Sequence, residues 1–321
     1  MEEREDAGTR RENSESYCQL SIFHMQLVWK AIALGILSLP LVAYSRGYWQ
    51  RPPRTELDRS LFEGVSYRRE ARNTPRPIAI HMVEIDFTAE GVEALVTPGN
   101  PPDTLEPDNM EVNARTTTEF LEEFDVQVAV NANFFYPFRE NTPWDYYPHS
   151  GDRANAVGLG MSGGQIYSPG QEEWPALCFG GDGRARIEGG GTCPEGTLHG
   201  VAGNRAIVED GQPANLPAKG SKDYTLYGRM AVGIDASGET LWIVAVDDKQ
   251  PGYSEGMRLA ELADLFVELG ANAAVNLDGG GSVTLAIDDG NGNAEILNAP
   301  IHVKIPMEER PVANHIGFYA R

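Results

Sequence analysis

The sequence predicts an α+β fold: a single domain with a large mixed or antiparallel β-sheet core and a few packing helices. Three observations lead to this prediction. Apolar runs of strand type outnumber helical patterns, several neighbouring runs are joined by short turns typical of hairpins, and no repeat of fixed period divides the body of the chain. The 321 residues, 41% of them hydrophobic, suffice to bury one large core.

The N-terminus is expected to hold three segments ahead of that domain, which we place at residues 78–321. Residues 1–24 are polar, and we interpret them as a prefix before a biological start at Met25. Residues 25–45 carry Lys30, a short apolar run and a small-x-small site, which is typical of a signal peptide. A retained membrane anchor is the alternative. Residues 46–77 are basic and contain proline, so we expect a stalk or linker. On this interpretation we expect the protein to be exported to the periplasm or the extracellular space, with its N-terminal segment either cleaved or retained as a membrane anchor.

The elements of the domain follow from apolar periodicity and from turn residues. We expect a long loop at 98–113, a short helix after the Thr116–Glu119 capping box, and mostly loops or short strands over 136–200. A second helix within 256–270 has apolar residues on one face and Gly270 as its stop. Strands are expected within 76–87, 92–98, 126–135, 200–214, 229–247, 272–288 and 313–321, with hairpins in 200–214 and 229–247.

The net charge of −21 makes nucleic acid a poor partner. Membrane contact is expected only through an uncleaved N-terminal segment. An anionic substrate would need a local positive site. Cys178 and Cys193 enclose a hairpin-like stretch and are expected to form a disulfide in an oxidising compartment, while Cys18 lies in the prefix. Two unpaired buried thiols are the alternative. No cysteine or histidine spacing suggests zinc, so neither a metal nor a cofactor is expected.

The stretch VNLDGGGSVTL (275–285) raises the sharpest question, because three consecutive glycines follow an aspartate at the end of a strand. Bare backbone allows a ligand to approach closely, and successive amides can bind an anion. A glycine-rich turn capped by Asp278 is the structural alternative.

Other polar residues stand at strand ends or on one strand face. Asn131 and Asn133 share a face of one strand, and Arg229 begins another strand with a side chain suited to phosphate. Asp247 ends the next strand, and Asp248 and Lys249 after it are expected to be a solvated charge cluster.

Several blocks together carry a family resemblance: NANFF, GRMAVGID, VDDKQPGYSEGMRLAELA, LGANAAVNLDGGGSVTL and ERPVANHIGFYA. Over roughly residues 78–321 the chain resembles the phosphodiester glycosidase family, which contains N-acetylglucosamine-1-phosphodiester α-N-acetylglucosaminidase, and its bacterial exported branch in particular. The resemblance implies hydrolysis of a sugar–phosphate diester to a free sugar and a phosphomonoester.

The resemblance also implies a set of site residues. We expect Asp278 to be the base or nucleophile and Asp247 or Glu261 to be the second carboxylate. The chain departs from the family pattern at Ala132, at Asp248–Lys249 and at Met230, which bears on substrate specificity. The expected substrate-binding residues are Asn131, Asn133, Arg229, Lys249, Gly279, Gly280, Gly281 and Ser282.

Two other functions stay open at this stage. One is a glycosidase that acts on a neutral exopolysaccharide linkage. The other is a non-catalytic glycan-binding or envelope protein on the same fold.

Overall fold

A computed structural model describes residues 29–30, 35, 39, 41–101, 110–216 and 225–321. The chain separates into two compact units, residues 1–49 and 50–321. In the first unit, residues 41–49 are helical, and the helix extends to residue 50. The prefix 1–24 and most of the expected signal peptide lie outside the described residues. Within the described ranges, no helix has the length and apolar character needed to cross a membrane.

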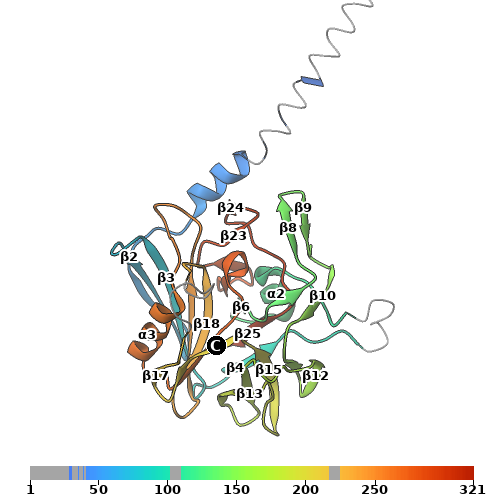
Figure 1. Ribbon diagram of the computed structural model, residues 1–321, viewed down its shortest axis with the longest axis vertical. Helices are drawn as coiled ribbons and strands as arrows, with labels where there is room; N and C mark the ends of the chain where they lie inside the picture. The colour runs from blue at the N-terminus through green and yellow to red at the C-terminus, as the bar shows by residue number, and fades with distance from the viewer. Residues whose placement is uncertain (1–28, 31–34, 36–38, 40, 102–109, 217–224) are drawn as a thin grey trace, which may run out of the picture. The chain divides into compact units, whose positions relative to one another are not determined.

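The second unit is built on an eight-stranded antiparallel sheet, called the main sheet here (Figure 1). The hairpins expected in 200–214 and 229–247 are confirmed as β16–β17 and β18–β19. In spatial order the strands are β1 (Leu57–Phe62), β2 (Val65–Arg72), β3 (Ile78–Asp86), β19 (Thr240–Val246), β18 (Arg229–Ile234), β20 (Ala273–Asn276), β16 (Arg205–Glu209) and β17 (Gln212–Pro213).

A five-stranded antiparallel sheet, the second sheet, packs against the main sheet. Their facing side chains form the largest apolar cluster, which includes Val83, Val232 and Ile243 from the main sheet and Val130 and Ile316 from the second. The strands in spatial order are β22 (Ala294–Ile296), β21 (Leu285–Asp288), β6 (Val128–Asn131), β25 (His315–Tyr319) and β4 (Glu93–Val96).

Two helices cover the outer faces of this sandwich. Helix α3 (Leu259–Leu269) packs Leu262 and Phe266 on the far face of the main sheet, and it ends at Gly270 in the left-handed region, as predicted. Helix α2 (Thr117–Phe124) packs Phe120 on the far face of the second sheet. The Thr116–Glu119 capping box is present. The resulting order is helix, sheet, sheet, helix.

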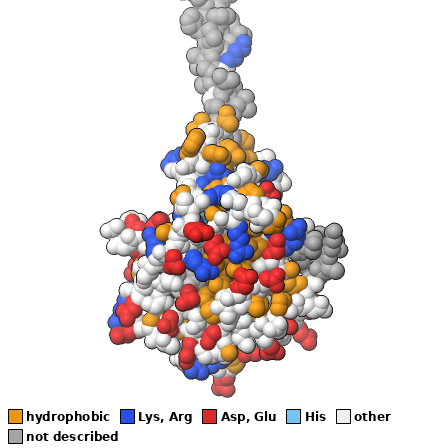
Figure 2. Space-filling model, turned by 90° about the vertical axis from the view of Figure 1, so that its left-hand side faces the viewer, with side chains coloured by type: hydrophobic (Ala, Val, Ile, Leu, Met, Phe, Trp, Pro, Cys, Tyr) orange, Lys and Arg blue, Asp and Glu red, His pale blue; other side chains and the backbone are white. Residues whose placement is uncertain are grey.

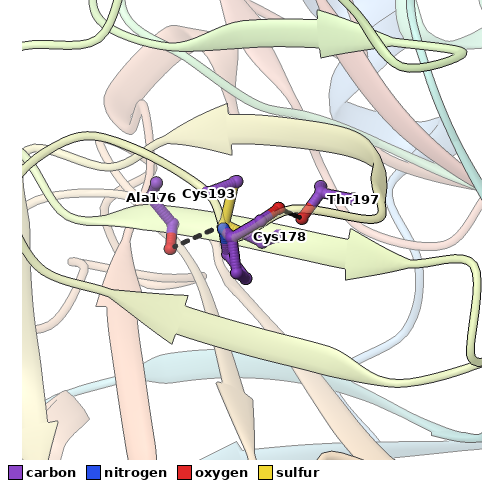
Figure 3. The surroundings of a disulfide bond; sticks show 5 residues. Ala176, Cys178, Cys193 and Thr197 are labelled. Carbon is purple, nitrogen blue, oxygen red and sulfur yellow. Dashed lines mark hydrogen bonds between the residues drawn. A yellow bond between two sulfur atoms is a disulfide. The ribbon is translucent and has the colours of Figure 1, made fainter.

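The middle of the chain forms a further five-stranded sheet, the third sheet. Its strands in spatial order are β12 (Gln165–Ser168), β11 (Gly160–Ser162), β15 (Thr197–Ala202), β13 (Ala176–Gly180) and β14 (Ala185–Glu188). The predicted disulfide is confirmed: Cys178 of β13 is bonded to Cys193 in the β14–β15 connection, with Cα atoms 5.7 Å apart (Figure 3).

Short strands complete the unit. They are β5 (Val112–Asn113), β10 (Arg153–Ala156) and β7 (Phe135–Tyr136) in one sheet, the hairpin β8 (Arg139–Thr142) and β9 (Asp145–Tyr147), and the hairpin β23 (Ile301–His302) and β24 (Ile305–Pro306).

The α+β prediction is confirmed, and its mixed-or-antiparallel sheet proves to be several antiparallel sheets. The structure differs from the prediction of a stalk at 46–77. Strands β1 and β2 lie within this segment, and β2 pairs with β3 along its whole length. Alternate residues of β2, namely Val65, Tyr67 and Arg69, are buried on one face, while the charged residues Arg68, Glu70 and Arg72 lie on the other face. On the face that carries β2 and α3, acidic and basic side chains are interspersed (Figure 2). The basic composition of 46–77 therefore reflects the exposed side chains of a folded surface and does not indicate a linker.

Candidate active site

Three strand ends of the main sheet meet at one edge. Strands β19 and β20 both pair antiparallel with β18, so they run in the same direction and end where β18 begins. Arg229 at the start of β18, Asp247 after β19 and Asp278 after β20 therefore come to the same edge. The topology accounts for the convergence of residues that lie up to about fifty positions apart in the sequence.

The loop after β20 does not close a hairpin. It carries the chain from the main sheet into β21 of the second sheet through a short 3₁₀ turn, Gly280–Ser282. Asn131, at the end of β6, holds both ends of this loop. Its amide Nδ2 donates to the Asp278 carbonyl at 2.7 Å, and its Oδ1 accepts from the Thr284 amide at 3.2 Å. The Asp278 amide donates to the Ala132 carbonyl at 2.9 Å.

The glycines of the loop are required by neighbouring protein atoms. A Cβ on Gly280 would lie 2.4 Å from the Tyr227 hydroxyl, and Gly280 has a φ of +62°. A Cβ on Gly281 would lie 2.4 Å from Nη2 of Arg310. The Gly280 amide is also engaged, since it donates to the Gly228 carbonyl at 2.9 Å. The bare backbone thus makes room for Tyr227 and Arg310.

The carboxyl group of Asp278 is half-buried beside this loop. Burial raises its pKa to about 6, although the Ser282 hydroxyl, the charges of Arg310 and Lys249 and the Gly279 amide lower it. An aspartic acid with a pKa close to neutrality can exchange protons at physiological pH, which suits a general base and which is uncommon for a structural surface carboxylate.

Arg310 is a residue of this site that sequence reasoning missed. Its Nη1 donates to the Ser282 hydroxyl at 3.1 Å, and its guanidinium lies 4.7 Å from the centre of the Phe138 ring. Its Nη2 pairs with Glu140 of β8. The side chain is buried, so Arg310 supplies fixed positive charge behind Asp278. Arg310 stands in ERPVANHIGFYA (309–320), one of the blocks that carry the family resemblance, but no apolar periodicity there separates it from a surface arginine.

Asp247 is buried in a hydrogen-bond network. One carboxylate oxygen accepts from the Asn298 side chain and the Ala299 amide, each at 2.9 Å, and the other lies 3.1 Å from Nε2 of His81. The opposite nitrogen of His81 lies 2.7 Å from the Tyr67 hydroxyl. Both side chains of the His81–Asp247 pair have zero exposure.

Asp248 corrects an expectation, because it is buried rather than solvated: it is only 2% exposed. Neither of its oxygens makes a well-formed hydrogen bond to the described residues. Burial raises the pKa of Asp248, while Lys249 and the nearby Gly228 amide lower it. The Lys249 ammonium lies 3.9 Å from its carboxylate and 4.6 Å from the Tyr227 ring centre. Lys249 itself is half-exposed and available to a ligand.

The remaining expected residues are bonded to protein atoms. Arg229 is buried and donates to the Met257 and Thr225 carbonyls at 3.0 and 3.1 Å. Asn133 donates to the carbonyls of Val157 and Leu159 at 3.0 and 2.9 Å.

Glu261 lies on α3 and is bonded to residues at that helix's N-terminus. It accepts from the Arg258 amide at 2.9 Å and from Arg76, which also bonds the Gly256 carbonyl. Burial raises the pKa of Glu261, but these arginine and amide contacts outweigh it and hold the pKa below its usual value. Among the residues that the structure describes, no three His, Cys, Asp or Glu side chains are grouped to hold a metal ion.

Comparisons with solved structures support the fold. A hypothetical protein from Synechocystis aligns with a TM-score of 0.59 at 16% identity, over 85% of this chain and 64% of that one, so this chain spans less than two thirds of it. The zebrafish N-acetylglucosamine-1-phosphodiester α-N-acetylglucosaminidase catalytic domain, auto-inhibited by its pro-peptide, aligns with a TM-score of 0.56 at 18% identity, over 86% and 93%. An exported protein from Burkholderia pseudomallei aligns with a TM-score of 0.54 at 14% identity, over 76% and 74%.

No curated protein matches the sequence significantly. The sequence profile of the phosphodiester glycosidase family matches residues 124–319, which is more than half of the chain and includes Asn131, the 247–249 turn, the glycine loop and Arg310. On that match, the chain belongs to the phosphodiester glycosidase family.

Proposed function

We propose that this protein hydrolyses a sugar–phosphate diester of the N-acetylglucosamine-1-phosphodiester kind, releasing the free sugar and a phosphomonoester. Family membership supports the reaction class. The observation that carries the proposal is Asp278, a half-buried carboxyl group with a pKa of about 6 beside two positive charges. The family resemblance noted from the sequence and the fold of the zebrafish relative point to the same substrate class.

In the proposed reaction, the bond between the anomeric carbon and the phosphate oxygen breaks, and a water molecule supplies the new hydroxyl. Asp278 either takes a proton from that water or attacks the anomeric carbon first. The bridging oxygen leaves with the phosphate, which is a good leaving group and needs little protonation. Lys249 attracts the phosphate, and Arg310 keeps positive charge close to Asp278.

We propose Asp248 as the second carboxylate in place of Asp247 or Glu261. The carboxylates of Asp247 and Glu261 are taken up by protein hydrogen bonds, whereas the Asp248 carboxylate makes no well-formed hydrogen bond to the residues that the structure describes and shares Lys249 with Asp278. Because its pKa is raised, Asp248 can carry a proton to the departing phosphate.

The other expected residues support the site from behind. Asn131, Asn133 and Arg229 fix the strand ends through their contacts with carbonyl groups, and Ser282 holds Arg310 against the loop. Gly279, Gly280 and Gly281 allow the loop to pack closely enough for this arrangement.

We also propose that the protein is exported. The disulfide between Cys178 and Cys193 supports an oxidising compartment, since such bonds rarely persist in the cytosol. Detection of the protein in the periplasm or medium after fractionation tests this proposal, and its confinement to the cytosolic fraction would contradict it.

The test of the activity is release of N-acetylglucosamine from a panel of α-N-acetylglucosamine-1-phosphodiesters. We expect Asp278→Asn to lower kcat/KM by about 10²–10⁴-fold, the usual contribution of a general acid or base, with an unchanged circular dichroism spectrum. Asp264→Asn, on α3, is the matched control. Failure of the wild type to release sugar from any member of the panel would overturn the proposed function, and full activity of Asp278→Asn would overturn the assignment of Asp278.

A further inference from the structure

An arm rich in aromatic residues stands next to the site. We define the aromatic arm as residues 135–147, which contain β7 and the β8–β9 hairpin. Three of its rings are largely exposed: Tyr136 at 53%, Phe138 at 48% and Trp144 at 65%. In Figure 1 the β8–β9 hairpin projects from the same end of the unit as β23 and β24. Exposed clusters of large apolar side chains usually mark binding surfaces.

The arm is joined to the glycine loop through Arg310. Glu140 pairs with Nη2 of Arg310 and accepts from the Val303 amide at 2.9 Å. The Phe138 ring lies against the same guanidinium, which in turn donates to Ser282. The arm is therefore in contact, through Arg310, with the loop that carries Asp278.

The pairing of the hairpin determines which of its side chains face this site. Phe138, just before β8, and Glu140 within it both contact the Arg310 guanidinium, so they face the same side of the hairpin. Tyr146 is the partner of Glu140 in the β8–β9 register, and its ring packs edge-on against His302 at 4.6 Å. Trp144 stands at the hairpin turn, two positions before Tyr146, and is the most exposed ring of the arm.

Polar groups alternate with the rings along the arm. Arg139 pairs with Asp145 at 2.8 Å, and Asn141 donates to Asp145 at 2.8 Å, all at the exposed surface. A sugar ring has apolar faces and a rim of hydroxyl groups, so it matches flat aromatic surfaces bordered by charged and amide groups. A lipid, or the apolar surface of a partner protein, would instead be matched by a continuous apolar surface.

We infer that the aromatic arm is a subsite for a carbohydrate chain, so that the substrate carries further sugar units beyond the scissile sugar–phosphate bond. The location of this subsite rests on the proposed function of the Asp278 site, but carbohydrate binding by the arm does not depend on catalysis. In this arrangement the bound carbohydrate extends from Lys249 and Asp278 past Phe138 to Trp144.

The test uses the full chain carrying Asp278→Asn, titrated by calorimetry with oligosaccharides of one to six units, one series built of N-acetylglucosamine and one of glucose. We expect the affinity for at least one series to increase with length, and Trp144→Ala in the same background to weaken binding of its hexasaccharide by tenfold or more. Tyr136→Ala is a second variant, since both exposed rings can be removed without opening the core.

The matched control is Ile166→Ala, which removes a 63% exposed apolar side chain from β12 of the third sheet and should leave the titration unchanged. Affinity independent of length in both series, or equal binding by the Trp144 and Ile166 variants, would overturn the inference. Length-dependent binding that needs Trp144 in a protein that cleaves no phosphodiester would keep the subsite and overturn the proposed reaction. Cleavage of phosphodiesters without length-dependent binding at Trp144 would keep the proposed reaction and overturn the subsite.

Discussion

Two turns at the same edge of the main sheet have opposite characters. The turn after β19 begins with Asp247, whose carboxylate is wholly enclosed and hydrogen-bonded to Asn298, Ala299 and His81. The loop after β20 begins with Asp278, which is half-buried and has a raised pKa. Both aspartates follow a buried strand, so the sequence pattern alone does not distinguish their roles.

The difference teaches that a strand-end aspartate can serve the fold or the chemistry, and that its hydrogen-bond partners decide which. Asp247 joins β3, β19 and the 298–299 segment, so its carboxylate oxygens are occupied by hydrogen bonds inside the protein. Asp278 is half-buried and lies near the half-exposed Lys249, so a ligand can reach it. Four predictions test this comparison.

The largest effect is expected from removing Asp247. Asp247→Ala should lower the free energy of unfolding by about 3–5 kcal/mol, because His81, the Asn298 side chain and the Ala299 amide each lose a buried hydrogen-bond partner. Urea denaturation monitored by circular dichroism measures this change. A loss below about 1 kcal/mol would show that the Asp247 network is not what holds the two strands together.

A smaller effect is expected from filling the space at Gly281. Gly281→Ala should lower stability by about 1–3 kcal/mol through overpacking and should reduce activity, because the new Cβ displaces Arg310. Gly189→Ala is the control, since no atom lies within 4 Å of its added Cβ and its φ is not in the left-handed region. Equal effects of the two substitutions would contradict the role of the Arg310 contact.

A pH dependence is expected from Asp278. If its carboxylate form is the active one, kcat/KM should rise as the pH increases through about 6. The stability contribution has the opposite sign: between the ordinary value of 3.8 and about 6 the folded state binds more protons than the unfolded state, so this contribution falls as the pH rises.

Unfolding at several pH values from 4 to 7, for the wild type and Asp278→Asn, isolates that contribution, and Lys249→Met should move the activity limb to higher pH. An activity limb near pH 4 in the wild type would contradict the raised pKa.

The smallest effect on stability is expected at Asp248. Asp248→Asn should change the free energy of unfolding by no more than about 1 kcal/mol, in either direction, because no well-formed hydrogen bond is lost and a neutral amide is easier to bury than a charge. Activity should nevertheless decrease. A large loss of stability would show that Asp248, like Asp247, has a structural role, and would contradict its assignment as the second carboxylate beside Asp278.

Much of the fold could be predicted from the sequence, because apolar periodicity and turn residues act locally. The hairpin of β18 and β19, the capping box at Thr116 and the stop at Gly270 are examples. The strands β1 and β2 were harder to foresee, since most of their charged residues face solvent and only alternate positions such as Tyr67 enter the core.

The candidate site could be predicted in part. Arg229, Asp247 and Asp278 were expected from their strand-end positions, and the topology brings them to one edge. The burial of Asp248 and the approach of Arg310 depend on contacts between distant segments, which no local pattern contains. The sequence also offers no means of telling that Asp247 and Glu261 would be occupied by other protein groups.

The missing side chains of the glycine loop have a consequence for how this site can change. Gly280 is matched to Tyr227 and Gly281 to Arg310, so each pair shares one volume that only one member can fill. A larger residue in the loop therefore needs a smaller partner, and it meets a second obstacle as well: the positive φ at Gly280, or the Ile301 carbonyl 2.9 Å from an added Cβ at Gly281. The phenol of Tyr227 and the guanidinium of Arg310 are thus tied to the glycines that they border, so a change at one member of a pair has to be matched by a change at the other.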